Sequence, residues 1–114
     1  MNIIDSYQFG EIVINGKKYT SDVIIFPDRV RDNWWRKTGH QLRLGDIAEV
    51  LTESPEVLVV GTGASGLVEV LPETRQAAQA QGIKLITEPT DKACRTYNQL
   101  SQSQRAVAAL HLTC

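Results

Sequence analysis

The sequence predicts an α/β protein, and two features of its pattern carry that prediction. Residues 57–60 form a continuous apolar run that leads directly into a glycine-rich segment at residues 61–66. Such a run is typical of a parallel strand covered on both faces, and the glycines suit the loop at the carboxyl edge of a sheet. From there to the C-terminus strand-like and helix-like patterns alternate, whereas the preceding half is rich in strand-forming residues.

Size and composition indicate the class of protein. The chain has 114 residues, of which 42% are hydrophobic and 22% charged, and this fits a single soluble domain spanning residues 1–114. No apolar run approaches the roughly 20 residues that cross a bilayer, and the N-terminus lacks the features of a signal peptide, so we expect no membrane association. Two cysteines are too few for a disulfide framework, and we therefore expect a reducing, cytoplasmic location.

The net charge of −1 conceals a basic segment between residues 29 and 43. Five basic residues and one acidic residue give this segment a charge of +4 and leave −5 for the remainder. A nucleic-acid-binding role for the whole chain is therefore not expected, whereas a local site for an anion remains open. The basic residues are Arg29, Arg31, Arg36, Lys37 and Arg43.

The N-terminal half predicts a β-hairpin. Residues 8–14 are rich in β-branched and aromatic residues and precede Asn15-Gly16, a pair that tolerates the positive φ angles of a type I′ turn. Residues 17–20 are the expected return strand, and their polar character suits an exposed edge. Residues 23–26 then predict a short apolar strand, which Pro27 ends.

Residues 28–44 show no clean period, so we expect an irregular loop with a turn of helix. Residues 45–51 follow as a short helix with one apolar face. Asp46 is expected to cap the first amides of this helix, and Glu49, three residues later, to reach back in a capping box.

The C-terminal half predicts two helices and two further strands. Pro72 suits the first position of a helix, and Gly82 lies where that helix is expected to end. Residues 83–87 are the next predicted strand, and Thr90 is expected to cap the helix that follows. Residues 105–113 carry small side chains on both faces and predict a final, central strand.

The glycine-rich segment matches G-x-G-x-x-G through Gly61, Gly63 and Gly66. Glu88 ends the next strand, about where a dinucleotide fold keeps its ribose-binding acid. That fingerprint requires a helix that begins within the glycines, so that its N-terminus meets the pyrophosphate. Here the helix is delayed until Pro72. We therefore favour glycines that allow a tight turn and close packing, and we expect no cofactor.

A second unusual segment, residues 34–40, combines both tryptophans with Arg36, Lys37 and His40. Adjacent side chains on an extended backbone point to opposite sides, so one tryptophan can cover the core while the other faces a cleft. The basic residues would then offer charge-assisted hydrogen bonds to a carboxylate or phosphate. In the alternative, both tryptophans fill the core and the basic residues form a solvated rim; the sequence leaves both interpretations open. One short patch is thin support for single-stranded nucleic acid, which is not expected.

No residue pattern completes a catalytic or metal site. His111 and Cys114 have H-x-x-C spacing, but side chains three apart on a strand point to opposite faces and no second pair exists, so no metal is expected. Cys94 lies on the apolar face of its predicted helix and is interpreted as a core residue. Ser65 lacks the G-x-S-x-G pattern of a nucleophile elbow. We therefore expect binding rather than catalysis, with enzyme activity left open.

Five motifs, taken together, resemble the Mth-type domain family of unknown function (DUF498) over essentially the whole chain. They are Tyr7-x-Phe9-Gly10, Asp22-Val23-Ile24-Ile25, Trp34-Trp35-Arg36-Lys37-x-Gly39-His40, Pro55-Glu56-Val57-Leu58-Val59-Val60-Gly61-Thr62-Gly63 and His111-Leu112-Thr113-Cys114. The resemblance implies a three-layer α/β fold in which helices flank a central mixed, mostly parallel sheet, with an N-terminal β-hairpin. The family includes an adipogenesis-associated protein and, more distantly, a mitochondrial complex I assembly factor. It has no established reaction, and the described roles imply binding.

We thus predict a small cytoplasmic binding or assembly-type domain with a protein partner. The alternative is an enzyme or sensor for a small anionic ligand, bound between the loop at residues 61–63 and the loop at residues 34–40. The candidate ligand-binding residues are Trp34, Trp35, Arg36, Lys37, His40, Gly61, Thr62 and Gly63. A cleft forms only if the two loops pack against one another, which the sequence does not decide.

Overall fold

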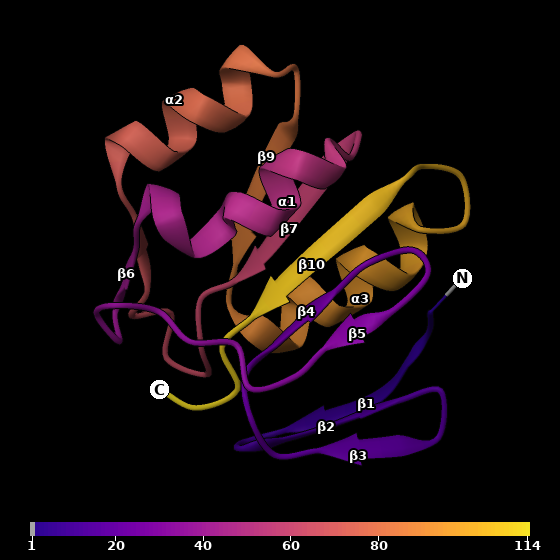
Figure 1. Cartoon of the computed structure of the whole chain (residues 1–114). Helices are drawn as coiled ribbons and strands as arrows, with labels where there is room; N and C mark the ends of the chain where they lie inside the picture. Colours follow the sequence, from indigo (N-terminus) through magenta and orange to yellow (C-terminus); the bar gives the residue numbers. More distant parts are fainter. Residues whose placement is uncertain (1) are drawn as a thin grey trace.

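A five-stranded mixed sheet forms the centre of the computed structural model, which describes residues 2–114 (Figure 1). Its strands, in spatial order, are β5 (Val30–Arg31), β4 (Val23–Ile25), β10 (Ala106–Leu110), β7 (Val57–Gly61) and β9 (Lys84–Glu88). Strands β10, β7 and β9 are parallel, whereas β4 is antiparallel to β10 and β5 to β4. The predicted α/β class and the central position of the last strand are confirmed.

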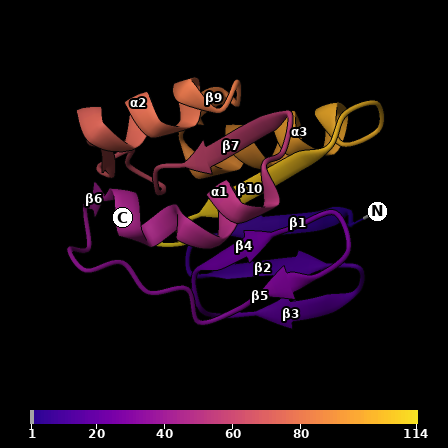
Figure 2. The ribbon, with the colours of Figure 1, turned by 45° about the horizontal axis from the view of Figure 1, so that its top comes forward.

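Helices and a second sheet cover the two faces of this central sheet. One face carries the 3-10 helix η1 (Leu44–Ile47), α1 (Ala48–Glu53) and α2 (Pro72–Ala80). The other carries α3 (Thr90–Leu100) and the antiparallel strands β1 (Ile4–Gln8), β2 (Glu11–Ile14) and β3 (Lys17–Tyr19). A short parallel pair, β6 (Gln41–Leu42) and β8 (Glu69–Val70), lies beside α2. Figure 1 and Figure 2 show these layers, which confirm the predicted three-layer arrangement.

The N-terminal hairpin is confirmed, although its first strand, β2, begins later than predicted. Asn15 and Gly16 have φ angles of 51° and 79° and join β2 to β3, as the Asn-Gly pair predicts. The continuous strand predicted over residues 8–14 is interrupted, because Phe9 and Gly10 form a turn in which Gly10 has a φ of 78°. Strand β1 precedes this turn and was not predicted. Its polar residues disfavour a strand locally, and it is held by pairing with β2.

The helix ends that depend only on backbone conformation were predicted correctly. Pro72 opens α2 and Gly82, with a φ of 75°, follows its end, as predicted. The two predicted side-chain caps are wrong. Asp46 lies inside η1, where its carboxylate accepts the N–H of Arg43 at 2.8 Å. Thr90 does not cap α3, because its hydroxyl accepts the Gly63 N–H and donates to the carbonyl of His111, the residue after β10.

Two hydrophobic clusters, one on each face of the sheet, hold the layers together. Alternate residues of β7 enter different clusters: Val59 faces α3, whereas Leu58 and Val60 face α1 and α2. Every residue of β7 and of β10 is buried, which explains why both segments lack polar side chains. Within residues 2–114, no helix has the length and apolar character needed to cross a membrane.

Candidate functional site

The glycine loop at residues 61–66 packs tightly against the end of β10, as its glycines predict. A Cβ atom added to Gly61 would lie 2.7 Å from the Leu110 side chain. A Cβ atom added to Gly63, whose φ is 103°, would lie 2.8 Å from the carbonyl oxygens of Thr113 and Cys114. Thr90 fixes this arrangement, because its hydroxyl accepts the Gly63 N–H at 2.9 Å. The helix that follows begins only at Pro72, so no helix N-terminus lies within the glycines.

The two adjacent tryptophans separate, one to the core and one to solvent. Only 8% of Trp34 is exposed, and its indole N–H donates to the Asp46 carbonyl at 3.1 Å. Trp35 is 86% exposed. The prediction that one tryptophan covers the core is confirmed for Trp34, and the interpretation in which both fill the core is wrong. That Trp35 faces a ligand cleft stays a prediction.

Arg36 turns inward and joins a buried polar network with Asp22 and His111. One terminal nitrogen of its guanidinium donates to the Asp22 carboxylate at 2.9 Å, and the other donates to the Gly39 carbonyl at 2.9 Å. The second nitrogen also lies 2.9 Å from His111 Nδ1, which is itself 2.8 Å from the Asp22 carboxylate. Asp22 further accepts the Leu112 N–H at 2.8 Å. The network thus fastens the loop at residues 34–40 to the C-terminal segment and to the start of β4.

His111 is the residue that both predicted loops contact. From one side, the His40 ring approaches it edge-on with a centroid separation of 5.9 Å. From the other side, Gly63 passes so close that an added Cβ would lie 2.9 Å from the His111 ring. The two loops are therefore neighbours separated by one imidazole ring. They line separate cavities, and the ligand-binding roles of the predicted residues stay predictions.

Most of the basic segment is neutralised by the fold. Arg29 pairs with Asp28, Glu49 and Glu53, and Arg31 pairs with Glu49. With Arg36 paired to Asp22, only Lys37 and Arg43 of the five basic residues lack an ion pair within the described chain. Residues that are close in the sequence therefore do not combine into a strong anion site, because carboxylates from other elements compensate most of the charge. These ion-pairing residues are Asp22, Asp28, Glu49 and Glu53.

The carboxylate of Asp22 links folding stability to pH. Burial by itself raises its pKa, but hydrogen bonds from His111, Leu112 and Arg36 outweigh burial and lower the pKa below its ordinary value. As the pH falls, the unfolded chain therefore binds a proton at Asp22 before the folded chain does. The stabilisation is complete above the unfolded-state pKa and is lost as the pH falls through the folded-state value.

We accordingly expect the wild-type protein to lose stability more steeply than the Asp22→Asn variant between about pH 5 and about pH 3, because only the wild type protonates this carboxylate. Urea unfolding at a series of pH values measures the difference. The gap between the two unfolding free energies should narrow as the pH falls, and a gap that stays constant would contradict the role given to Asp22.

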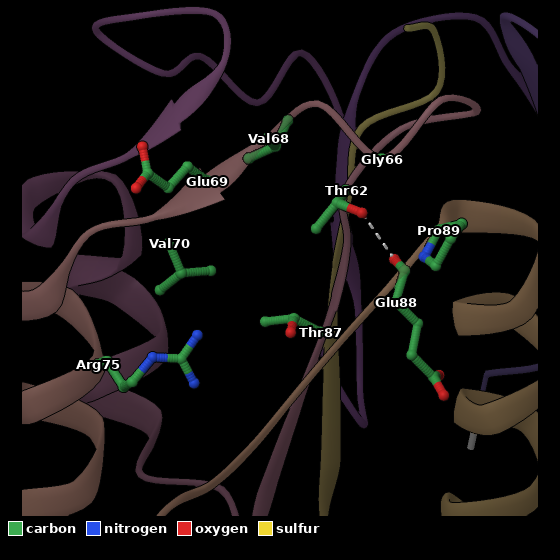
Figure 3. Close-up of a pocket in the computed structure, with 9 residues that line it drawn as sticks. All are labelled: Thr62, Gly66, Val68, Glu69, Val70, Arg75, Thr87, Glu88 and Pro89. Atoms are coloured by element: carbon green, nitrogen blue, oxygen red, sulfur yellow. Dashed lines mark hydrogen bonds between the residues drawn. The ribbon is translucent and has the colours of Figure 1, made fainter.

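A crevice opens beyond the carboxyl ends of β7 and β9. The chain leaves β7 toward α2 on one face of the sheet and leaves β9, through Pro89, toward α3 on the other. This divergence is the position at which open α/β sheets bind ligands. A cavity of about 450 Å³ lies there, within the usual range for small-molecule sites (Figure 3). Its lining includes Thr62, Gly66, Val70, Arg75, Thr87 and Pro89.

The roles of three residues of these sites were not predicted from the sequence, although Asp22 and His111 belong to the motifs that carry the resemblance to the DUF498 family. Asp22 and His111 are 89 positions apart and meet only through the pairing of β4 with β10. Arg75 belongs to a strongly helix-forming stretch and has no neighbouring motif. Its approach to the glycine loop follows from the placement of α2 over the sheet.

The thiols and the histidines do not assemble a metal site. Within residues 2–114, no three His, Cys, Asp or Glu side chains converge closely enough to hold a metal ion. Burial raises the pKa of the Cys94 thiol to about 12, which keeps this cysteine protonated and confirms its interpretation as a core residue. Cys114 is exposed at the C-terminus.

Comparison with known proteins places these features in a family context. Residues 4–112 match the sequence model of a family described as "Protein of unknown function (DUF498/DUF598)". The NADH dehydrogenase [ubiquinone] 1 alpha subcomplex assembly factor 3 of Mus musculus is 30% identical over 113 residues, an alignment that covers 93% of this chain and 57% of the mouse protein. The chain thus spans less than two thirds of that relative's length.

Two solved structures share the fold along almost their full length. A conserved hypothetical protein of Pyrococcus horikoshii has a TM-score of 0.82 and 29% identity, with 97% of this chain and 98% of that chain covered. An outer membrane protein of Bartonella henselae has a TM-score of 0.84 and 29% identity, with 97% and 94% covered. The predicted resemblance to the DUF498 family is confirmed.

Proposed function

Because the chain belongs to the DUF498/DUF598 family and is related to an NADH dehydrogenase assembly factor, we propose that it is a binding module of the assembly type. In this proposal residues 1–114 act as one domain, bind a protein partner and carry out no reaction. The cytoplasm is the proposed location, on the basis of the two unpaired cysteines. The surface around Trp35 is the proposed contact with the partner.

The exposure of Trp35 is the observation that supports this surface. Trp35 is 86% exposed, the highest fraction among the large hydrophobic residues at positions 2–114. Tryptophan is among the residues that most often dominate binding energy at protein interfaces, where it fills a pocket of the partner. A ring that projects from the surface suits insertion into such a pocket.

The loop beneath Trp35 is held in place before any partner binds. Trp34 on one side is buried and hydrogen-bonded to the Asp46 carbonyl, and Arg36 on the other is fixed by Asp22 and Gly39. Trp35 lines two hollows, of about 430 Å³ and about 390 Å³. They give this surface a shape that side chains of a complementary partner can fill. A loop fixed in this way loses little conformational entropy when it binds, which favours affinity.

We expect Trp35→Ala to weaken partner binding by about 30-fold or more while leaving the Tm unchanged, since a central tryptophan typically contributes about 2 kcal/mol or more. Partners are first recovered by affinity purification from cells of the source organism. The strongest is then purified, and its Kd for the wild type and the variant is measured by calorimetry.

Phe9→Ala provides the matched control, because Phe9 is also a large exposed aromatic residue, 63% exposed, in the turn between β1 and β2. This variant should bind the purified partner with the wild-type Kd. Equal binding by wild type and Trp35→Ala would overturn the proposed surface, and turnover of a substrate by the purified chain would overturn the non-catalytic role.

The alternative, a small anionic ligand held jointly by residues 34–40 and 61–63, has weaker support. His111 occupies the space between the two loops, and the Arg36 guanidinium is already bonded to Asp22 and Gly39. The glycine loop also uses its amides internally, because Gly63 and Ala64 donate to Thr90 and Thr113. Few donors are therefore left for an anion at that point.

A further inference from the structure

The crevice beyond β7 and β9 contains a positive charge that the fold does not compensate. Arg75 extends from the first turn of α2, and Figure 3 shows its guanidinium pointing across the cavity toward Thr87. Within residues 2–114, no hydrogen bond or ion pair engages this guanidinium, in contrast to the paired groups of Arg29 and Arg36. Arg75 is an exposed residue of the crevice lining, and an unpaired guanidinium in such a position can bond to an anion.

The two acidic residues of the crevice do not neutralise Arg75. The Glu69 carboxylate points away from the guanidinium in Figure 3. The Glu88 carboxylate also points away and is occupied elsewhere, because it accepts the Thr96 hydroxyl at 2.6 Å and lies 3.6 Å from the Lys92 ammonium group. Neither acid therefore forms an ion pair with Arg75, and the Glu69 carboxylate remains a second charged group of the crevice lining.

Three amides of the glycine loop are already used within the fold and are not free for an anion. The amides of Gly63 and Ala64 donate to Thr90 and Thr113, and the amide of Gly66 donates to the Gly63 carbonyl at 3.2 Å. A phosphate-binding loop needs such amides free and pointing at the ligand. Arg75 is the single basic residue among the described residues that line the crevice.

We propose that this crevice binds a small organic anion through the planar fork of the Arg75 guanidinium. The fork matches the two oxygens of a carboxylate or of a phosphate monoester. The Thr87 hydroxyl, which has no partner in the described chain, supplies a further donor, and Val68 and Val70 offer an apolar wall for the remainder of the ligand. The site is independent of the Trp35 surface and can exist whether or not that surface binds a protein.

The test is a titration of the full chain, labelled for two-dimensional proton–nitrogen NMR, with inorganic phosphate, phenyl phosphate and benzoate at constant ionic strength. We expect saturable shifts of the amides of Gly66, Thr87 and Glu88. Saturation by phenyl phosphate alone identifies a phosphate monoester site, saturation by benzoate alone identifies a carboxylate site, and saturation by both supports the shared oxyanion chemistry.

Arg75→Gln should weaken the binding of the effective probe at least about tenfold, because a charge-assisted hydrogen-bond pair is lost. Arg95→Gln is the matched control, since it makes the same change on an exposed residue of α3, on the opposite face of the sheet, and its affinity should equal that of the wild type. If Arg75→Gln lowers the Tm, Thr87→Val serves as the second variant, with an expected severalfold loss of affinity.

The proposal is overturned if no probe gives saturable shifts. It is also overturned if Arg75→Gln binds as tightly as the wild type, or if Thr87→Val does so where Arg75→Gln is destabilised. A third contradicting result is a set of shifts that concentrates at residues 34–40. The last result would instead indicate an anion site beside Lys37.

Discussion

Asp22→Asn is expected to lower the free energy of unfolding by about 3 kcal/mol, because it removes the carboxylate from a buried ion pair and leaves its partners without compensation. Asp22 is mostly buried, and the Arg36 side chain is only 5% exposed. The asparagine amide can still accept one hydrogen bond but cannot balance the guanidinium charge. Urea unfolding at neutral pH measures the loss.

Asp28→Asn is the control for this variant. Asp28 also pairs with an arginine, Arg29, but its side chain is 73% exposed, and solvent screens such a pair. This variant should unfold at nearly the wild-type urea concentration. Equal losses in the two variants would show that the Asp22 network contributes no more than a surface pair.

Asp22→Asn should also loosen two segments that are far apart in the sequence. Asp22 accepts the Leu112 N–H and holds Arg36, so its loss releases both the C-terminal segment and the loop that carries Trp35. Faster amide exchange at Leu112 would report the first change. Weaker binding of a protein partner that contacts Trp35 would report the second change.

Gly63→Ala is expected to destabilise the fold by about 3 kcal/mol, the sum of a left-handed backbone penalty of about 1 kcal/mol and of steric overlap in a packed interior. Gly63 has a φ of 103°, and an added Cβ would lie 2.8 Å from two backbone carbonyl oxygens, which cannot rotate away as a flexible side chain would. The C-terminal segment must shift to admit the methyl group. Thermal and urea unfolding measure the cost.

Gly66→Ala separates the two contributions. Gly66 also has a positive φ, of 70°, but an added Cβ would meet nothing closer than the Thr62 hydroxyl at 3.7 Å. This variant should show only the backbone penalty, about 1 kcal/mol. If the two alanine variants were equally stable, contact with the C-terminal segment would not be the reason for glycine at position 63.

Local patterns in the sequence were sufficient for most of the secondary structure. The Asn15-Gly16 turn, the start of α2 at Pro72 and the buried strand before Gly61 are each decided by residues within a few positions. The side-chain caps failed for the opposite reason. The Thr90 hydroxyl can bond to its own helix or to Gly63 and His111, and only the assembled fold selects the latter.

The sequence by itself determined that this chain is an α/β protein and that its glycine loop forms a tight turn without a phosphate-binding helix. It left open whether one tryptophan covers the core while the other faces a cleft. Tertiary structure decided that Trp35 is the exposed one, that Arg36 is buried against Asp22 and His111, and that Arg75 faces the crevice. Backbone preferences act over a few residues, whereas the compensation of a charge and the shape of a cavity depend on elements that only folding brings together.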